Sequence, residues 1–182
     1  MTSGIDLGRP TAGDVIDLIT DDHRRFERLL SQLRLATADR DAVRQAFAHV
    51  LIAHGEAEEE LVYPALRKDD AISGHDAHHG EEEHAEGNQA LLALLELKGT
   101  ETKAFTDAAE ELSNLIAHHI AEEELSILEP ARTETSTKVR YDLGAKWAQR
   151  RNELIDAGCG SLDNVRRIVA QAEKEGLLED AE

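Results

Sequence analysis

The composition of this 182-residue chain favours one all-helical domain with room for an extension, because 41% of its residues are hydrophobic but only 3% are aromatic. A formal net charge of −18 argues against binding to nucleic acid or to an anionic membrane surface. The single cysteine, Cys159, excludes an internal disulfide and a thiolate metal cluster within one chain. No signal peptide and no apolar run of membrane-spanning length is visible, so we expect a cytoplasmic protein.

Four segments repeat their apolar residues every three or four positions, which is the period of an amphipathic helix. They follow residues 1–13, whose Gly, Pro and Thr content predicts a loosely packed segment. The four predicted helices carry a stripe from Ile16 to Leu33, a stripe from Val43 to Pro64, a run from about Glu81 to Lys98, and a run from about Thr102 to Leu128. Four helices in succession predict an antiparallel up-and-down four-helix bundle over residues 14–130.

Two segments lie outside this helical pattern. The connection DDAISGHDAHHG, residues 69–80, is the one long loop expected within the bundle. Its histidines, His75, His78 and His79, are interpreted as solvated side chains, with gating or a second, weak metal site as the alternative. Pro130 is expected to end the fourth helix. Beyond it, residues 131–182 predict a helical C-terminal extension, with one helix around Trp147 and another from Ser161 to Gly176.

The most informative feature is a repeated His-x-x-x-Glu pattern in the second and fourth helices. Residues four apart project from the same face of a helix, about 6 Å apart along its axis, so such a pair can bind one metal centre. His23 and His84 lie on the apolar stripes of the other two helices. Burying these groups without partners is costly, which points to a bound cation. Nitrogen and oxygen donors without thiolate suit two bridged first-row metal ions, and favour iron, then manganese or zinc.

The fourth helix has adjacent histidines and adjacent glutamates, which leave two registers for its copy of the motif. The first copy supplies His54 and Glu58. A shift of 64 residues matches the letters and selects His118 and Glu122. A shift of 65 residues selects His119 and Glu123.

Hydrophobic positions favour the shift of 65 residues. This shift aligns Phe47 with Leu112, whereas the shift of 64 aligns Phe47 with Glu111 and so makes a poor core. We therefore predict six metal ligands: His23, His54, Glu58, His84, His119 and Glu123. Neighbouring glutamates such as Glu59 and Glu124 are interpreted as charges on the helix faces.

These motifs resemble the hemerythrin-like (HHE cation-binding) proteins of bacteria. The matching segments are DDHRRFERLL, HGEAEEELVYP, EEHAEGNQALL and HHIAEEELSIL, and the resemblance continues into YDLGAKWAQRRNEL. It implies a four-helix bundle around a non-haem di-iron centre, two iron ions joined by an oxo or hydroxo bridge. The resemblance also implies that Glu58 and Glu123 bridge the irons, and that the histidine ligands are His23, His54, His84 and His119.

One departure from the family bears on function. Oxygen-carrying hemerythrins have an additional histidine one turn from the third-helix ligand, whereas the corresponding positions around His84 are Gly80 and Asn88. Six protein ligands favour reaction with a small oxidant (H2O2, O2 or NO), including catalase-like decomposition of peroxide, over reversible oxygen carriage. The alternatives are an oxygen or redox sensor and an iron-binding, oxygen-carrying protein without catalysis. Tyr63 is expected to pack at a helix end, with a phenol near the irons as the alternative.

Overall fold

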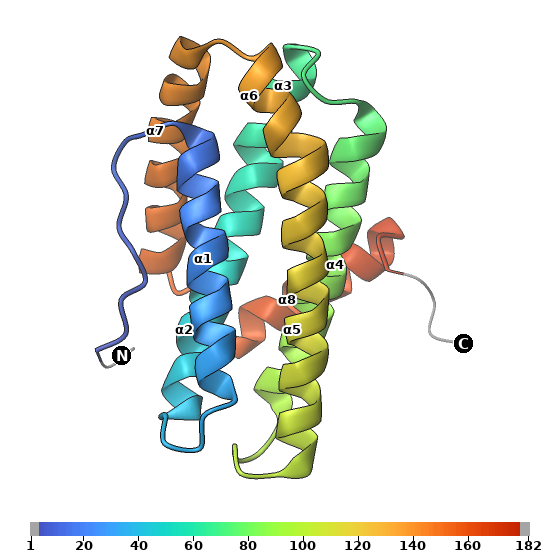
Figure 1. Cartoon of the computed structure of the whole chain (residues 1–182). Helices are drawn as coiled ribbons and strands as arrows, with labels where there is room; N and C mark the ends of the chain where they lie inside the picture. Colours follow the sequence, from blue (N-terminus) through green and yellow to red (C-terminus); the bar gives the residue numbers. More distant parts are fainter. Residues whose placement is uncertain (1–3, 179–182) are drawn as a thin grey trace.

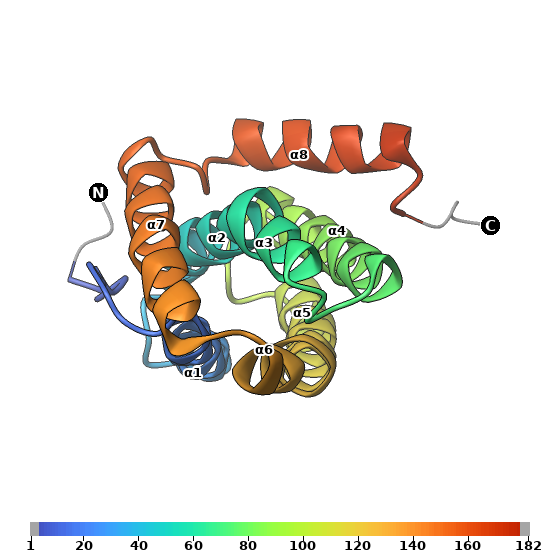
Figure 2. The ribbon, with the colours of Figure 1, turned by 90° about the horizontal axis from the view of Figure 1, so that it is seen from above.

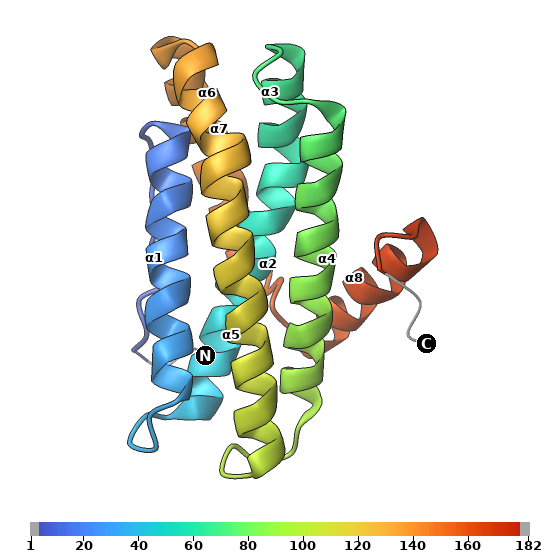
Figure 3. The ribbon, with the colours of Figure 1, turned by 45° about the vertical axis from the view of Figure 1, so that its right-hand side comes forward.

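Four long helices lie side by side in the computed structural model, which describes residues 4–178 (Figures 1 and 3). They are α1 (Val15–Leu33), α2 (Arg40–Ala57), α4 (Gly74–Glu96) and α5 (Lys103–Glu123). Helices α1 and α4 each contact both α2 and α5, so the four helices form a closed ring. Their apolar stripes meet inside this ring, where Ile19, Phe26, Phe47, Leu91 and Leu112 are all fully buried. Every regular element of residues 4–178 is a helix, which confirms the all-helical prediction.

Polar side chains determine where these helices begin. The Asp14 carboxylate accepts a hydrogen bond from the Ile16 amide at the start of α1. At α4, the Ser73 hydroxyl accepts from the Asp76 amide, and the Asp76 carboxylate accepts from the Ser73 amide. This capping box starts α4 at Gly74, so the prediction of a loop up to residue 80 was wrong. The Ser-x-x-Asp signal was present in the sequence.

The second and fourth helices continue through their prolines, so the prediction that Pro130 ends a helix was wrong. Each passes through one π-helical turn, η1 (Glu58–Val62) or η2 (Glu124–Leu128). Each then resumes as a short helix, α3 (Tyr63–Lys68) or α6 (Glu129–Glu134), with proline in its first turn. The wider turn accommodates a residue that has no N–H to donate. Both π turns lie at the predicted bridging glutamates, and such turns are frequent at functional sites.

The chain after α6 forms two more helices, as predicted, that pack outside the ring (Figure 2). Helix α7 (Thr137–Asp156) contacts α1 and α2, and α8 (Leu162–Glu175) contacts α4. The Trp147 side chain of α7 is fully buried. Gly144 lets α7 approach the Gly13 carbonyl, because a Cβ on residue 144 would clash with that oxygen. Gly176 ends α8 with φ of 72°, a left-handed cap that suits glycine.

The segment before α1 is better packed than its composition predicts. The Arg151 guanidinium donates hydrogen bonds to the carbonyl oxygens of Leu7 and Gly8, at 2.7 and 3.1 Å. The Asn152 amide donates to the Pro10 carbonyl at 2.8 Å. The expectation of a loosely packed segment is therefore wrong for residues 7–10, and residues 1–3 lie outside the described part of the chain. None of the helices described is both long and apolar enough to cross a membrane.

Candidate metal centre

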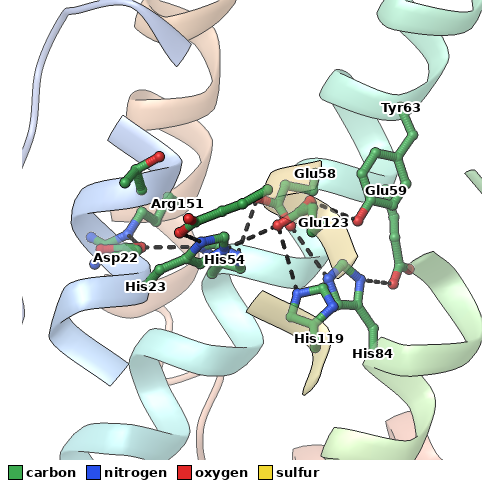
Figure 4. A network of polar contacts seen from close by, with 12 residues as sticks. Asp22, His23, His54, Glu58, Glu59, Tyr63, His84, His119, Glu123 and Arg151 are labelled. Atoms are coloured by element: carbon green, nitrogen blue, oxygen red, sulfur yellow. Dashed lines mark hydrogen bonds and ion pairs between the residues drawn. The ribbon is translucent and has the colours of Figure 1, made fainter. Parts of the chain in front are cut away.

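The six predicted ligands converge in the interior of the helix ring (Figure 4). All six are buried, with exposures between 0 and 6%. They form two overlapping groups whose ligand atoms lie within 4.8 Å of one another. The first group is His23, His54, His119 and Glu123, and the second is His54, Glu58 and His84. The structure thus brings all six predicted ligands to one place. Metal binding by these residues stays a prediction.

Eight polar atoms of these six residues are buried without a hydrogen-bond partner: His54 Nδ1, and seven atoms in the positions expected of metal-binding atoms. These seven are the Nε2 atoms of all four histidines, both carboxylate oxygens of Glu58, and Oε2 of Glu123. The Nε2 atoms lie 3.0–3.7 Å from these glutamate oxygens, in orientations that make no hydrogen bond. Buried polar atoms are normally satisfied, and leaving them unpaired costs stability. A cation between the imidazoles and the carboxylates would satisfy them, so the residues fit a metal centre.

The outward-facing nitrogen of each imidazole lies against a second carboxylate. The Nδ1 atoms of His23, His84 and His119 are 3.0, 2.8 and 3.1 Å from Glu124, Glu59 and Glu83. The His54 Nδ1 atom lies 3.5 Å from Asp22. Such carboxylates fix the ring orientation and tautomer of metal-binding histidines, and they increase the ligand's basicity. All four rings therefore present Nε2 to the centre.

These outer carboxylates follow a simple sequence rule that the sequence interpretation missed. Asp22 and Glu83 immediately precede the lone histidines His23 and His84, and each contacts the His-x-x-x-Glu histidine of the neighbouring helix. Glu59 and Glu124 immediately follow the predicted bridging glutamates, and each contacts a lone histidine. The interpretation of Glu59 and Glu124 as simple helix-face charges was therefore wrong.

The two halves of the cluster differ in what neutralises these carboxylates. Arg151 of α7 is fully buried and contacts both oxygens of Asp22, at 2.5 and 2.8 Å. Arg25 adds a further contact to Asp22 at 2.7 Å. Within residues 4–178, the basic groups within 4 Å of the Glu83 carboxylate are instead histidines: His79, His118 and His119. Arg151 could not be foreseen, because its role depends on how α7 packs.

The placement of the fourth helix agrees with the shift of 65 residues. His119 and Glu123 are 2% and 1% exposed and lie in the cluster. The side chain of His118 is 63% exposed, and Glu122 is only partly buried. The pair selected by matching letters therefore lies outside the centre.

Tyr63 reaches the cluster and does more than pack at a helix end. Its hydroxyl donates a hydrogen bond to Glu123 Oε1 at 3.0 Å, and its ring stacks on His84 with 5.8 Å between centroids. The same ring lies over Gly80, where a Cβ would be 2.8 Å from the Tyr63 oxygen. Asn88 faces a groove that it shares with α8. Gly80 thus has no room for another imidazole beside Tyr63, whereas Asn88 lies on the side of α4 that faces α8.

Burial and charge shift the pKa values of these groups in opposite directions. Burial, reinforced by the Glu123 charge, raises the pKa of Glu58 to about 8. Burial opposes ionisation of Glu123 too, but His23 and His119 beside it hold its pKa below the usual range. Burial alone would lower the pKa of His23, but Glu123 and Glu58 raise it to about 9. The raised pKa values of Glu58 and His23 favour protonated side chains in the metal-free cluster, and metal binding would release these protons.

The comparisons with known proteins agree with this geometry. Residues 14–131, more than half of the chain, match the family model described as the hemerythrin HHE cation binding domain. No curated protein and no solved structure matches the chain. The matched range contains all six clustered residues and ends before α7 begins. The chain therefore belongs to the hemerythrin family of HHE cation-binding domains.

Proposed function

We propose that the buried cluster binds two iron ions, with Glu58 and Glu123 between them and His23, His54, His84 and His119 around them. The observation that carries this proposal is the set of seven buried donor atoms without hydrogen-bond partners. Imidazole and carboxylate donors without thiolate suit iron. Two overlapping ligand groups in one cluster favour two ions over one. Carboxylates placed between two ions are typical of dinuclear sites.

We also propose that α1, α2, α4 and α5 form an antiparallel up-and-down bundle spanning residues 14–130. The closed ring of contacts among these helices supports this topology. Residues 131–182 would then be an extension that begins within α6 and contributes Arg151 to the metal centre.

We infer that the loaded protein reacts with a small oxidant, H2O2, O2 or NO, and that it decomposes peroxide in a catalase-like manner. The iron ions would supply the change of oxidation state. The chain would supply protons: the Tyr63 hydroxyl donates to Glu123 Oε1. The Glu59 and Glu124 side chains, 38% and 31% exposed, connect solvent to the Nδ1 atoms of His84 and His23. The partners in this function are small molecules, without nucleic acid or membrane.

Two alternatives in the same family are a sensor and an oxygen carrier. The contact of Arg151 with Asp22, and through it with His54, favours the sensor alternative because it links α7 to the centre. The packing of Tyr63 against Gly80 disfavours the carrier alternative, because it takes the space of an additional histidine.

The test is oxygen evolution from H2O2 by the iron-loaded protein, with one O2 released for every two peroxides consumed. We expect Glu123→Gln to lose this activity and Glu122→Gln to keep it, since only Glu123 lies in the cluster. Iron content is measured for each variant alongside the activity. A stable, reversible oxygen complex of the reduced protein without peroxide decomposition would contradict the proposal and favour the carrier.

A further inference from the structure

The Glu83 carboxylate occupies a special position between the buried cluster and the surface of α4 and α5. Its side chain is only 7% exposed. One oxygen, Oε2, lies 3.1 Å from His119 Nδ1 and so faces the metal centre. The other oxygen, Oε1, is buried without a hydrogen-bond partner. An unsatisfied buried carboxylate oxygen is costly, so Oε1 indicates a missing cationic partner.

Two solvent-exposed imidazoles surround this oxygen. His118 of α5 places Nε2 3.5 Å from Glu83 Oε1, and His79, one turn before Glu83 in α4, places Nε2 3.7 Å away. The side chains of His118 and His79 are 63% and 47% exposed, so neither ring is fixed by core packing. The two Nε2 atoms do not lie within 4.8 Å of each other, so both exposed rings must rotate to place them on one ion beside Oε1. Glu82 lies 3.6 Å from the other His79 nitrogen and adds negative charge.

The other half of the cluster indicates what kind of group belongs there. Asp22 contacts His54, and Glu83 makes the corresponding contact with His119. The two acidic residues also occupy equivalent sequence positions, immediately before His23 and His84. Both oxygens of Asp22 contact the Arg151 guanidinium. Glu83 has imidazoles at that place instead, open to solvent. A cation bound there would neutralise Glu83 as Arg151 neutralises Asp22.

We propose that His79, Glu83 and His118 form a second metal site, on the surface, for a divalent first-row transition ion. Two imidazoles and one carboxylate are a donor set that such ions bind with open positions for water. The net charge of −18 raises the local concentration of cations. The site is separate from the buried cluster, and Glu83 joins the two through His119. It does not depend on which metal the buried cluster holds.

The test is calorimetric titration of the protein as purified, without an affinity tag, with Zn²⁺. We expect the double variant His79→Ala/His118→Ala to bind one Zn²⁺ fewer per chain than the wild type. Both residues are exposed, so the fold should be unchanged, which the helical circular dichroism signal checks. The buried cluster is the same in both proteins, so the difference in stoichiometry reports the surface site alone, whether or not the proposed iron centre is correct.

His78→Ala is the matched control. His78 is 55% exposed and contacts Glu81 and Glu82, two exposed carboxylates of the same helix. It therefore represents an ordinary surface pairing, and its variant should keep the wild-type stoichiometry. In a parallel titration with Co²⁺, the wild type should show visible absorption bands that the double variant lacks. Equal Zn²⁺ stoichiometry in the wild type and the double variant, or loss of the ion in His78→Ala, would overturn the proposal.

Discussion

Replacing Arg151 with methionine tests whether the C-terminal extension stabilises the metal centre. Methionine keeps much of the side-chain volume but removes the charge and the donors. The variant would leave Asp22, which is 1% exposed, without its bidentate partner beside His54. The carbonyl oxygens of Leu7 and Gly8 would also lose their hydrogen bonds. We therefore expect a loss of stability and weaker metal binding in the same variant.

The size of the stability loss follows from the burial of the pair. Removing one partner of a buried ion pair costs about 3–5 kcal/mol, because the other charge stays buried. Arg25 keeps a 2.7 Å contact with Asp22, which places the expected loss near the lower end, at about 3 kcal/mol. For a chain of this size, that corresponds to a melting temperature lower by roughly 6–12 °C. Metal affinity should fall by about 10-fold, the lower end of the range for losing an outer carboxylate, because Asp22 stays beside His54 but loses the Arg151 contact that orients it.

The assay is urea unfolding of the metal-free proteins, followed by circular dichroism. Arg150→Met is the matched control: Arg150 contacts Glu60 at 2.7 Å, but both side chains are at least 36% exposed. Such a surface pair contributes about 0–1 kcal/mol. Adding Asp22→Asn to Arg151→Met should recover part of the loss, because it removes the unpaired charge. Equal stability of the Arg151→Met and Arg150→Met variants would refute the role given to this ion pair.

Three further predictions concern the ligands, the metal and the cysteine. Glu123→Ala should lose most of the iron and Glu122→Ala should keep it, as measured by metal analysis; the reverse would favour the 64-residue shift. Removing iron should lower the melting temperature in calorimetry, because a metal that binds only the folded state stabilises it; equal melting would contradict a buried site. Burial raises the pKa of Cys159 to about 12, so its thiol should react slowly with iodoacetamide at pH 8 in the folded protein. The unfolded thiol ionises near pH 9, so the stability that the buried, protonated thiol contributes should be lost between pH 9 and 12. Cys159→Ala should therefore show a shallower decline in unfolding free energy than the wild type over that range. Parallel declines would contradict the raised pKa of Cys159.

The sequence predicted which six side chains lie together because its signals are local and repeated; that they bind metal stays a prediction. A His-x-x-x-Glu pair keeps its spacing on any helix, and core-forming residues such as Phe47 and Leu112 constrain the register of the two copies. The result is a correct placement of His119 and Glu123 inside, and of His118 outside.

Other features depend on tertiary packing or on backbone geometry that periodicity does not reveal. Arg151 lies 129 residues from Asp22, and nothing near it in the sequence indicates burial. The π turns before Pro64 and Pro130 let helices continue where a proline normally ends them. The capping box at Ser73 was readable in the sequence, but the polar histidine-rich composition of the following turn favoured a loop.

The most direct test of the proposed metal centre is the metal content of the aerobically purified protein. We expect two iron ions per chain, with near-ultraviolet charge-transfer absorption of a bridged ferric pair. This expectation follows from the two overlapping groups of candidate ligands, each of which could hold one ion. One metal ion per chain, or zinc in place of iron in cells supplied with both metals, would contradict the di-iron assignment.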